Sequence, residues 1–222
     1  MRSKVLWVKT AILLAMFGLA LTSMPAESPT FDEQGFLVRG LAYLRGEERG
    51  GHRGLRVGHP LGLNALNASL LVNDPTVVLP SADPSWRETS FHRPAELFLW
   101  EIGNDVEHIM FLARLPTLWL GLLMAAIAGR WAAEIVHLRN RDANRSRATV
   151  FAGLIGLVLL AFDPNVLAHM RLVTTDLGLA AATTFAGFAL WHYFQRPSLA
   201  RAAVGGIGLG LLLNTKFTAL LF

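Results

Sequence analysis

The sequence predicts an all-α protein, a polytopic membrane helical bundle of about five transmembrane helices with juxtamembrane amphipathic helices in a long first external loop. Hydrophobic residues make up 53% of the 222 residues and charged residues only 16%, whereas an ordinary soluble domain carries about 25% charged residues. The mean hydropathy of the chain is +0.42. Apolar blocks of bilayer-spanning length recur along the chain, which is typical of a multi-pass membrane protein.

The charge distribution also favours a membrane protein. The net charge is +4 and the isoelectric point is near 10.1, which is a balance also found in nucleic-acid-binding domains. Here, however, the basic residues lie between the apolar segments and form no single stripe, so we expect no nucleic-acid partner. The chain has no cysteine, which excludes disulfides, thiolate catalysis and cysteine-based zinc sites.

Five apolar blocks are expected to form the spans. The first follows a basic start and is long enough to cross a bilayer, although a cleaved signal peptide is the alternative. Both interpretations place residue 27 onward outside the cytoplasm. We place the spans near residues 5–24, 112–138, 149–165, 172–194 and 200–222.

The first external loop, residues 25–111, contains its own helical patterns. Leucines recur at helical spacing in "GFLVRGLAYL" and "PLGLNALNASLLV", and "RPAELFLWEIGNDVEHIMF" opens with a proline at a favourable first helical position. We predict short amphipathic helices on the membrane surface.

The connecting loops predict the orientation. Residues 139–147 carry four arginines and residues 195–201 carry two, whereas residues 163–171 carry one. Under the positive-inside rule the N-terminus and the two basic loops are cytoplasmic. The first loop and residues 163–171 then face the opposite side of an integral multi-pass protein, in the inner membrane if the source is a bacterium.

An acidic pair, Asp32 and Glu33, follows the first span directly. A partly desolvated carboxylate at this position can act as a base toward a hydroxyl or an amine. Acids at the start of a helical run also cap the helix and favour its dipole. Position alone leaves both interpretations open.

Two cations lie within apolar stretches. Arg114 is near the start of the second span and Lys216 is in the last block. A cation at such a depth needs a partner or water, and a guanidinium fits a phosphate well. The alternative is that each side chain anchors the topology by reaching the outer surface.

The segment "HMRLVTTD" places His169, Arg171 and Asp176 on the outer side. Asp176 precedes a wholly apolar run and needs a partner, for which Arg171, Arg114 and His169 are the candidates. A purely structural pair is the alternative. His52, His59 and Asp32 show no ligand spacing, so no metal site is predicted.

Five segments together resemble one enzyme family: "FDEQGFLVRG", "GHPLGLNALNASLL", "ARLPTLWLGLL", "DPNVLAHMRLVTTDLGLA" and "LLNTKFTALL". In this order they resemble the dolichyl-phosphate-mannose-protein mannosyltransferases and their bacterial relatives, the aminoarabinose transferases and other GT-C membrane glycosyltransferases. The resemblance implies a polytopic helical enzyme that transfers a sugar, with inversion, from a polyprenyl-phosphate donor to a protein, lipid or glycan acceptor.

The resemblance also implies roles for individual residues. Asp32 matches the acid that deprotonates the acceptor, with Glu33 beside it, and Arg114, Arg171 and Lys216 are candidates for the donor phosphate. His59, His169 and Asp176 are expected in the substrate pocket. No cofactor is implied with certainty, and a requirement for a divalent cation stays open.

The chain departs from the family in two respects. Relatives often carry two prolines and a lysine after the loop histidine, whereas "HPLGLN" has one proline and no lysine. The chain also ends inside an apolar run, and we expect an N-terminal fragment of a longer enzyme. The rival interpretations are a non-catalytic transporter or flippase subunit for lipid-linked sugars and an inactive fragment.

Overall fold

The computed structural model describes residues 2–47, 59–88, 90–139 and 145–221. This part of the chain consists of helices, turns and loops, with no strand. The all-α prediction is therefore confirmed for the described residues.

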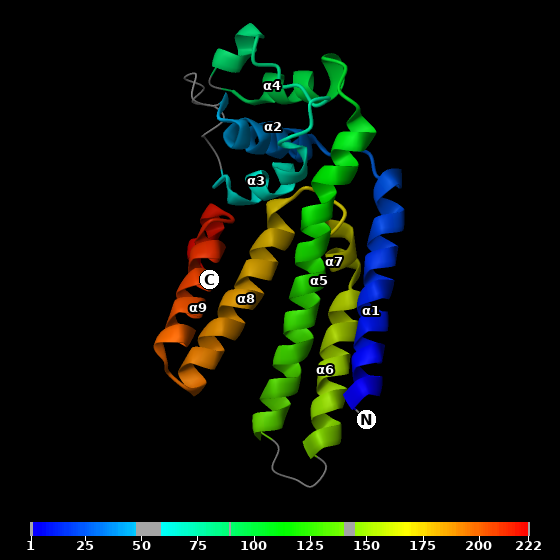
Figure 1. The fold of residues 1–222 in the computed structure, drawn as a ribbon, viewed down its shortest axis with the longest axis vertical. Helices are drawn as coiled ribbons and strands as arrows, with labels where there is room; N and C mark the ends of the chain where they lie inside the picture. The colour runs from blue at the N-terminus through cyan, green and yellow to red at the C-terminus, as the bar shows by residue number, and fades with distance from the viewer. Residues whose placement is uncertain (1, 48–58, 89, 140–144, 222) are drawn as a thin grey trace.

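Five long helices lie side by side and form a bundle (Figure 1). Consecutive helices run in opposite directions along its long axis, so their connections alternate between the two ends, in the order that the sequence predicts. The helices are α1 (Arg2–Ser23), α5 (Val106–Arg139), α6 (Arg145–Ala161), α8 (Thr175–Gln195) and α9 (Leu199–Leu213).

A layer of shorter helices lies across the end of the bundle where α1 ends and α5 begins (Figure 1). The three helical patterns of the first loop form helices here, and their placement on a membrane surface stays a prediction. The elements of this layer are η1 (Met24–Ala26), α2 (Phe31–Arg45), α3 (Gly62–Ala68), η4 (Ser69–Leu71), η5 (Pro84–Arg87), α4 (His92–Glu96) and η6 (Leu97–Glu101).

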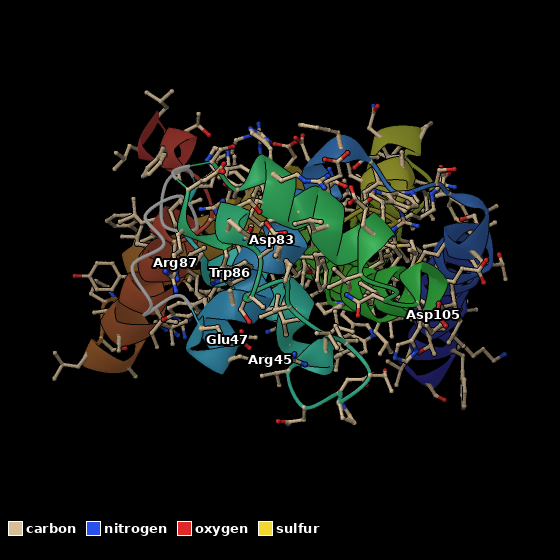
Figure 2. The ribbon with its side chains drawn as sticks, turned by 90° about the horizontal axis from the view of Figure 1, so that it is seen from above. Arg45, Glu47, Asp83, Trp86, Arg87 and Asp105 are labelled. Carbon is tan, nitrogen blue, oxygen red and sulfur yellow. The ribbon has the colours of Figure 1, made fainter. Side chains whose placement is uncertain are left out.

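Arg45, at the end of α2, ties this layer together (Figure 2). Its guanidinium donates hydrogen bonds of 2.6 to 3.1 Å to the backbone carbonyls of Leu71, Val72, Asp74 and Val77. The carbonyls of Leu71 and Asp74 also accept backbone hydrogen bonds, so the guanidinium adds a direct link between the end of α2 and the segment that follows η4.

Two helical segments are long and apolar enough to cross a membrane by length and composition, Ser3–Ala26 and Val106–Arg139. Helices α6 and α9 have 17 and 15 residues, which correspond to about 25 and 22 Å at 1.5 Å per residue. The hydrocarbon core of a bilayer is about 30 Å thick. Further spans beyond these two stay a prediction.

The structure corrects the ends of two predicted spans. The block 149–165 ends as a helix at Ala161, because Asp163 accepts hydrogen bonds from two backbone amides and starts the short helix α7 (Pro164–His169). The block 200–222 is not one helix either. Helix α9 ends at Leu213, and a 3₁₀ helix η7 (Phe217–Leu221) follows Lys216.

Close helix approaches at two glycines hold the short-helix layer against the bundle. A Cβ added at Gly40 of α2 would lie 2.1 Å from the carbonyl oxygen of Asn64 in α3. A Cβ at Gly178 of α8 would lie 2.4 Å from a methyl carbon of Leu63. Helix α3 is therefore in direct contact with α2 on one side and α8 on the other, which fixes the α2 residues relative to the start of α8.

Candidate functional site

The acidic pair at the start of α2 separates into one buried and one exposed carboxylate. Glu33 is 0% exposed and Asp32 is exposed. Glu33 accepts hydrogen bonds from Nε and Nη2 of Arg114, both at 2.9 Å, and from the amides of Thr30 and Val173, both at 2.8 Å. Each carboxylate oxygen thus accepts two hydrogen bonds, one of them from Arg114.

The hydrogen-bonding capacity of Arg114 is also fully used. Its side chain is 2% exposed. Nη1 donates to the carbonyls of Met24 and Glu27 at 3.1 and 2.9 Å, and Nη2 also donates to the carbonyl of Ser28 at 3.3 Å. Together with the two bonds to Glu33, all five N–H donors of the guanidinium have acceptors within the protein.

This geometry corrects two expectations. Glu33 does not fit a catalytic base, because it is out of reach of solvent and its lone pairs are occupied. Arg114 does not fit a phosphate ligand, because it has no donor left for one. The pair instead joins α5, the linker after α1, the start of α2 and the segment before α8. Glu33 also caps α2, because it accepts a hydrogen bond from the backbone amide of Thr30, as the helix-capping alternative expects.

Four of the predicted site residues, Asp32, His59, Asp176 and Lys216, interact electrostatically where the short-helix layer meets the start of α8 and the segment after α9. Nζ of Lys216 lies 2.8 Å from Oδ1 of Asp176, and their side chains are 24% and 54% exposed. The charge of Lys216 lowers the pKa of His59, and the charges of Asp176 and Asp32 raise it. This group is called the outer charge cluster below.

The actual partner of Asp176 is Lys216, whereas the sequence suggested Arg171, Arg114 or His169. The bond depends on the end of α9 at Leu213, because the turn that follows brings Lys216 beside the first turn of α8. A continuous helix to residue 222 would have carried this lysine farther along the axis of α9. The same turn therefore explains why both the end of this helix and the partner of Asp176 differ from the prediction.

His59 is held in the cluster by neighbours on both sides. Nη2 of Arg39 donates a 3.1 Å hydrogen bond to its backbone carbonyl, and its ring lies 6.0 Å from the ring of Phe217. Burial lowers the pKa of His59, and the positive charges of Lys216 and Arg39 lower it further, while Asp176 and Asp32 oppose the shift. The neutral imidazole is therefore favoured near pH 7, and its buried Nδ1 has no hydrogen-bond partner among the described residues.

His169 and Arg171 make different contacts from the ones expected. Nη1 of Arg171 pairs with Oε1 of Glu27 at 2.8 Å, next to the linker that Arg114 also binds. Nδ1 of His169, at the end of α7, is buried without a partner among the described residues, as is Nε of Arg171. Within the described residues, no hydrogen bond or ion pair joins either side chain to the outer charge cluster.

An apolar pocket of about 270 Å³ lies next to the outer charge cluster. Its wall includes Gly178, two residues after Asp176, and Thr215, the residue before Lys216. The remaining wall comes from α3, α5, α8 and the end of α9: Gly62, Leu63, Leu66, Leu120, Leu123, Ala181, Ala182, Phe185, Leu211 and Asn214. An ionic pair thus borders a pocket with an almost wholly apolar lining.

Arg39 is the residue of this site that the sequence argument missed. It lies in α2, is 1% exposed, and its guanidinium carbon lies 5.3 Å from the centre of the Phe91 ring. Burial lowers its pKa from the ordinary value. The available signal was an arginine between Val38 and Gly40 on the apolar face of a predicted amphipathic helix.

Within the described residues there is no group of three or more metal-ligating side chains. His52, for which no metal site was predicted, lies outside these residues. Comparison of the chain with protein-family models, with curated proteins and with solved structures finds no match.

Proposed function

We propose that the protein is a membrane glycosyltransferase that moves a sugar from a polyprenyl-phosphate donor to an acceptor at the non-cytoplasmic face. The proposal includes a multi-pass topology with the short-helix layer outside the cytoplasm, as the arginine-rich loops favour. It rests on the family resemblance of the sequence and on one structural observation, the outer charge cluster beside the apolar pocket.

That juxtaposition suits a substrate with two unlike parts. A prenyl chain is apolar and fits a pocket formed by leucine, alanine and phenylalanine side chains. A phosphate joined to it needs a cation at the pocket rim. Lys216 is at that rim and uses one of its three N–H donors on Asp176, and the other two have no acceptor among the described residues.

Asp32 is the proposed base. It is exposed, in contrast to Glu33, and its charge acts on His59. In the proposed step the Asp32 carboxylate accepts the proton of an acceptor hydroxyl, and the acceptor oxygen forms a bond to the anomeric carbon. The bond between that carbon and the phosphate oxygen breaks, and its electron pair stays on the prenyl phosphate.

The residues around this step have separable roles. The negative charge on the leaving phosphate grows in the transition state, so the Lys216 ammonium stabilises the transition state more than the ground state. Asp176 holds Lys216 in place. Arg39 positions His59 through its backbone carbonyl.

The test is Asp32→Asn in the full chain, purified in detergent and supplied with labelled sugars on defined undecaprenyl and dolichyl phosphates. We expect the rate of sugar release to fall by about 10² to 10⁴-fold, the usual contribution of general-base catalysis. Glu88→Gln is the matched control, since Glu88 is also an exposed acid of the short-helix layer but is absent from the cluster. Release that is unchanged in Asp32→Asn would refute the assignment of the base.

A lipid-linked sugar transporter is the rival function, and the same preparations distinguish it. A transporter binds the donor without cleaving it, so wild-type protein would retain labelled donor and release no sugar. The proposed substrate groups favour the enzyme, because the Lys216–Asp176 pair and the Glu33–Arg114 pair lie where the short-helix layer meets the bundle.

A further inference from the structure

A pocket with charged and aromatic lining residues lies at the opposite end of the bundle, where α5 and α8 end and α9 begins (Figure 1). Its volume is about 330 Å³. The lining residues are Glu134, His137, Leu138, Trp191, His192, Gln195, Arg196 and Arg201. None of them belongs to the outer charge cluster.

The only carboxylate in this lining is already neutralised. Oε1 of Glu134 accepts a 2.7 Å hydrogen bond from Nε of Arg130, and Oε2 lies 3.0 Å from Nε2 of His192. Both oxygens of Glu134 therefore face partners within the bundle. The two arginines of the lining are left as the charges that a ligand would meet.

Arg201 is pre-positioned for an anion. Its Nη1 donates to the backbone carbonyls of Arg196 and His192 at 2.7 and 3.4 Å, which fixes the guanidinium at the end of α8. Its Nε and Nη2 have no acceptor among the described residues. Arg196 is exposed, and its side chain makes no ion pair with the described part of the chain. Two guanidinium groups with open donors offer the planar, paired geometry that suits phosphate.

Large apolar side chains flank these arginines in the sequence and are exposed. Phe194 is 74% exposed and Leu199 is 91% exposed, and each lies within three residues of Arg196. Trp191 adds an aromatic wall to the pocket. Arginine, tryptophan and exposed apolar residues in one short segment are typical of the interface between the lipid headgroups and the hydrocarbon.

We infer that this pocket binds the phosphate of an anionic membrane phospholipid, with Arg196 and Arg201 as its ligands. The exposed Phe194 and Leu199 favour a lipid over a free phosphate, because only a lipid also covers apolar surface beside the arginines. The site is independent of the proposed sugar transfer. It is at the end of the bundle where α5 ends at Arg139 and α9 begins at Leu199, and the proposed topology places this end at the anionic lipids of the cytoplasmic leaflet.

The test measures the dissociation constant of labelled phosphatidylglycerol for the full chain in mixed detergent micelles. Arg196→Gln should weaken binding by about fivefold or more, since it removes a charged donor from the headgroup. Arg147→Gln is the matched control: Arg147 is an exposed arginine at the same end, near the start of α6, but does not line the pocket. It should change the constant by less than about twofold. Arg201→Lys keeps the positive charge but removes the planar guanidinium with its paired N–H donors, and should also weaken binding.

Three outcomes would overturn the inference. Equal losses in Arg196→Gln and Arg147→Gln would mean general attraction to a basic surface. Phosphatidylcholine bound as tightly as phosphatidylglycerol would mean that apolar contact alone drives binding. Displacement of the lipid by equimolar inorganic phosphate would mean that the site recognises a free anion. The measurement involves no sugar donor, so its failure would leave the proposed transferase untouched, and failure of sugar release would leave this site standing.

Discussion

The bond between Glu33 and Arg114 leads to a stability prediction that the structure makes quantitative. Glu33→Gln replaces one carboxylate oxygen with an amide nitrogen, and each oxygen accepts two hydrogen bonds. Two buried donors therefore lose their acceptor, each at a cost of about 1 to 3 kcal/mol. The charge of Arg114 is also left uncompensated. Removal of one partner from a buried pair costs about 3 to 5 kcal/mol, so we expect the free energy of unfolding to fall by that amount.

The assay is thermal or detergent-induced unfolding of the purified full chain, followed by circular dichroism. A loss of about 3 kcal/mol corresponds to a decrease in Tm of at least about 6 °C for a chain of this size. Asp32→Asn, one residue away, should leave the unfolding transition nearly unchanged because Asp32 is exposed. Similar transitions for both variants, or a neutral Glu33→Gln, would refute the structural role of the pair.

Arg114→Met extends the same prediction. It removes the donor to three backbone carbonyls as well as the partner of Glu33, so the loss should equal or exceed that of Glu33→Gln. The double variant should lose less than the two single variants added together, because each single change already breaks the shared bonds. Additive losses would contradict a direct pair.

Two further predictions concern helix packing and pH. Gly40→Ala should destabilise the protein by about 1 to 3 kcal/mol or more, because its methyl group would meet the backbone of Asn64 at 2.1 Å. Gly18→Ala is the control, since no atom lies within 4 Å of its Cβ. It should be neutral or stabilising in the same unfolding assay. Burial and the adjacent cations hold the pKa of His59 below its ordinary value of 6.5. The unfolded chain thus takes up this proton first as the pH falls, so the stability of the wild type should decrease from about pH 7 toward pH 5. The stability of His59→Gln should decrease less over that range. Parallel pH profiles of stability for the two proteins would contradict the environment assigned to His59.

The helical architecture could be predicted because it depends on composition and periodicity. Each apolar block of the sequence contains one long helix, and the leucine patterns of the first loop mark α2 and α3. The ends of the helices were harder to predict from the sequence. The stop of α9 at Leu213 depends on a local turn at Asn214, and the polar residues that mark it, Asn214 to Lys216, interrupt an apolar run that otherwise reads as one span.

The partners of these charged side chains could not be read from the sequence for a physical reason. Spacing along one helix fixes which side chains share a face, but the partners here come from distant segments. Lys216 and Asp176 are forty residues apart and Arg114 and Glu33 eighty-one. Burial cost predicts that each charge needs a partner, and only the packing of the helices decides which one it finds.

The acidic pair illustrates how helix geometry assigns different roles to neighbouring residues. Successive side chains on an α-helix point about 100° apart, so two adjacent carboxylates in α2 cannot share one environment. Once Glu33 turns inward to Arg114, Asp32 must turn toward the surface beside His59. The buried carboxylate fixes the rotation of α2, and that rotation determines where the exposed one points. A structural role for Glu33 is therefore a condition for a catalytic role of Asp32, not an alternative to it.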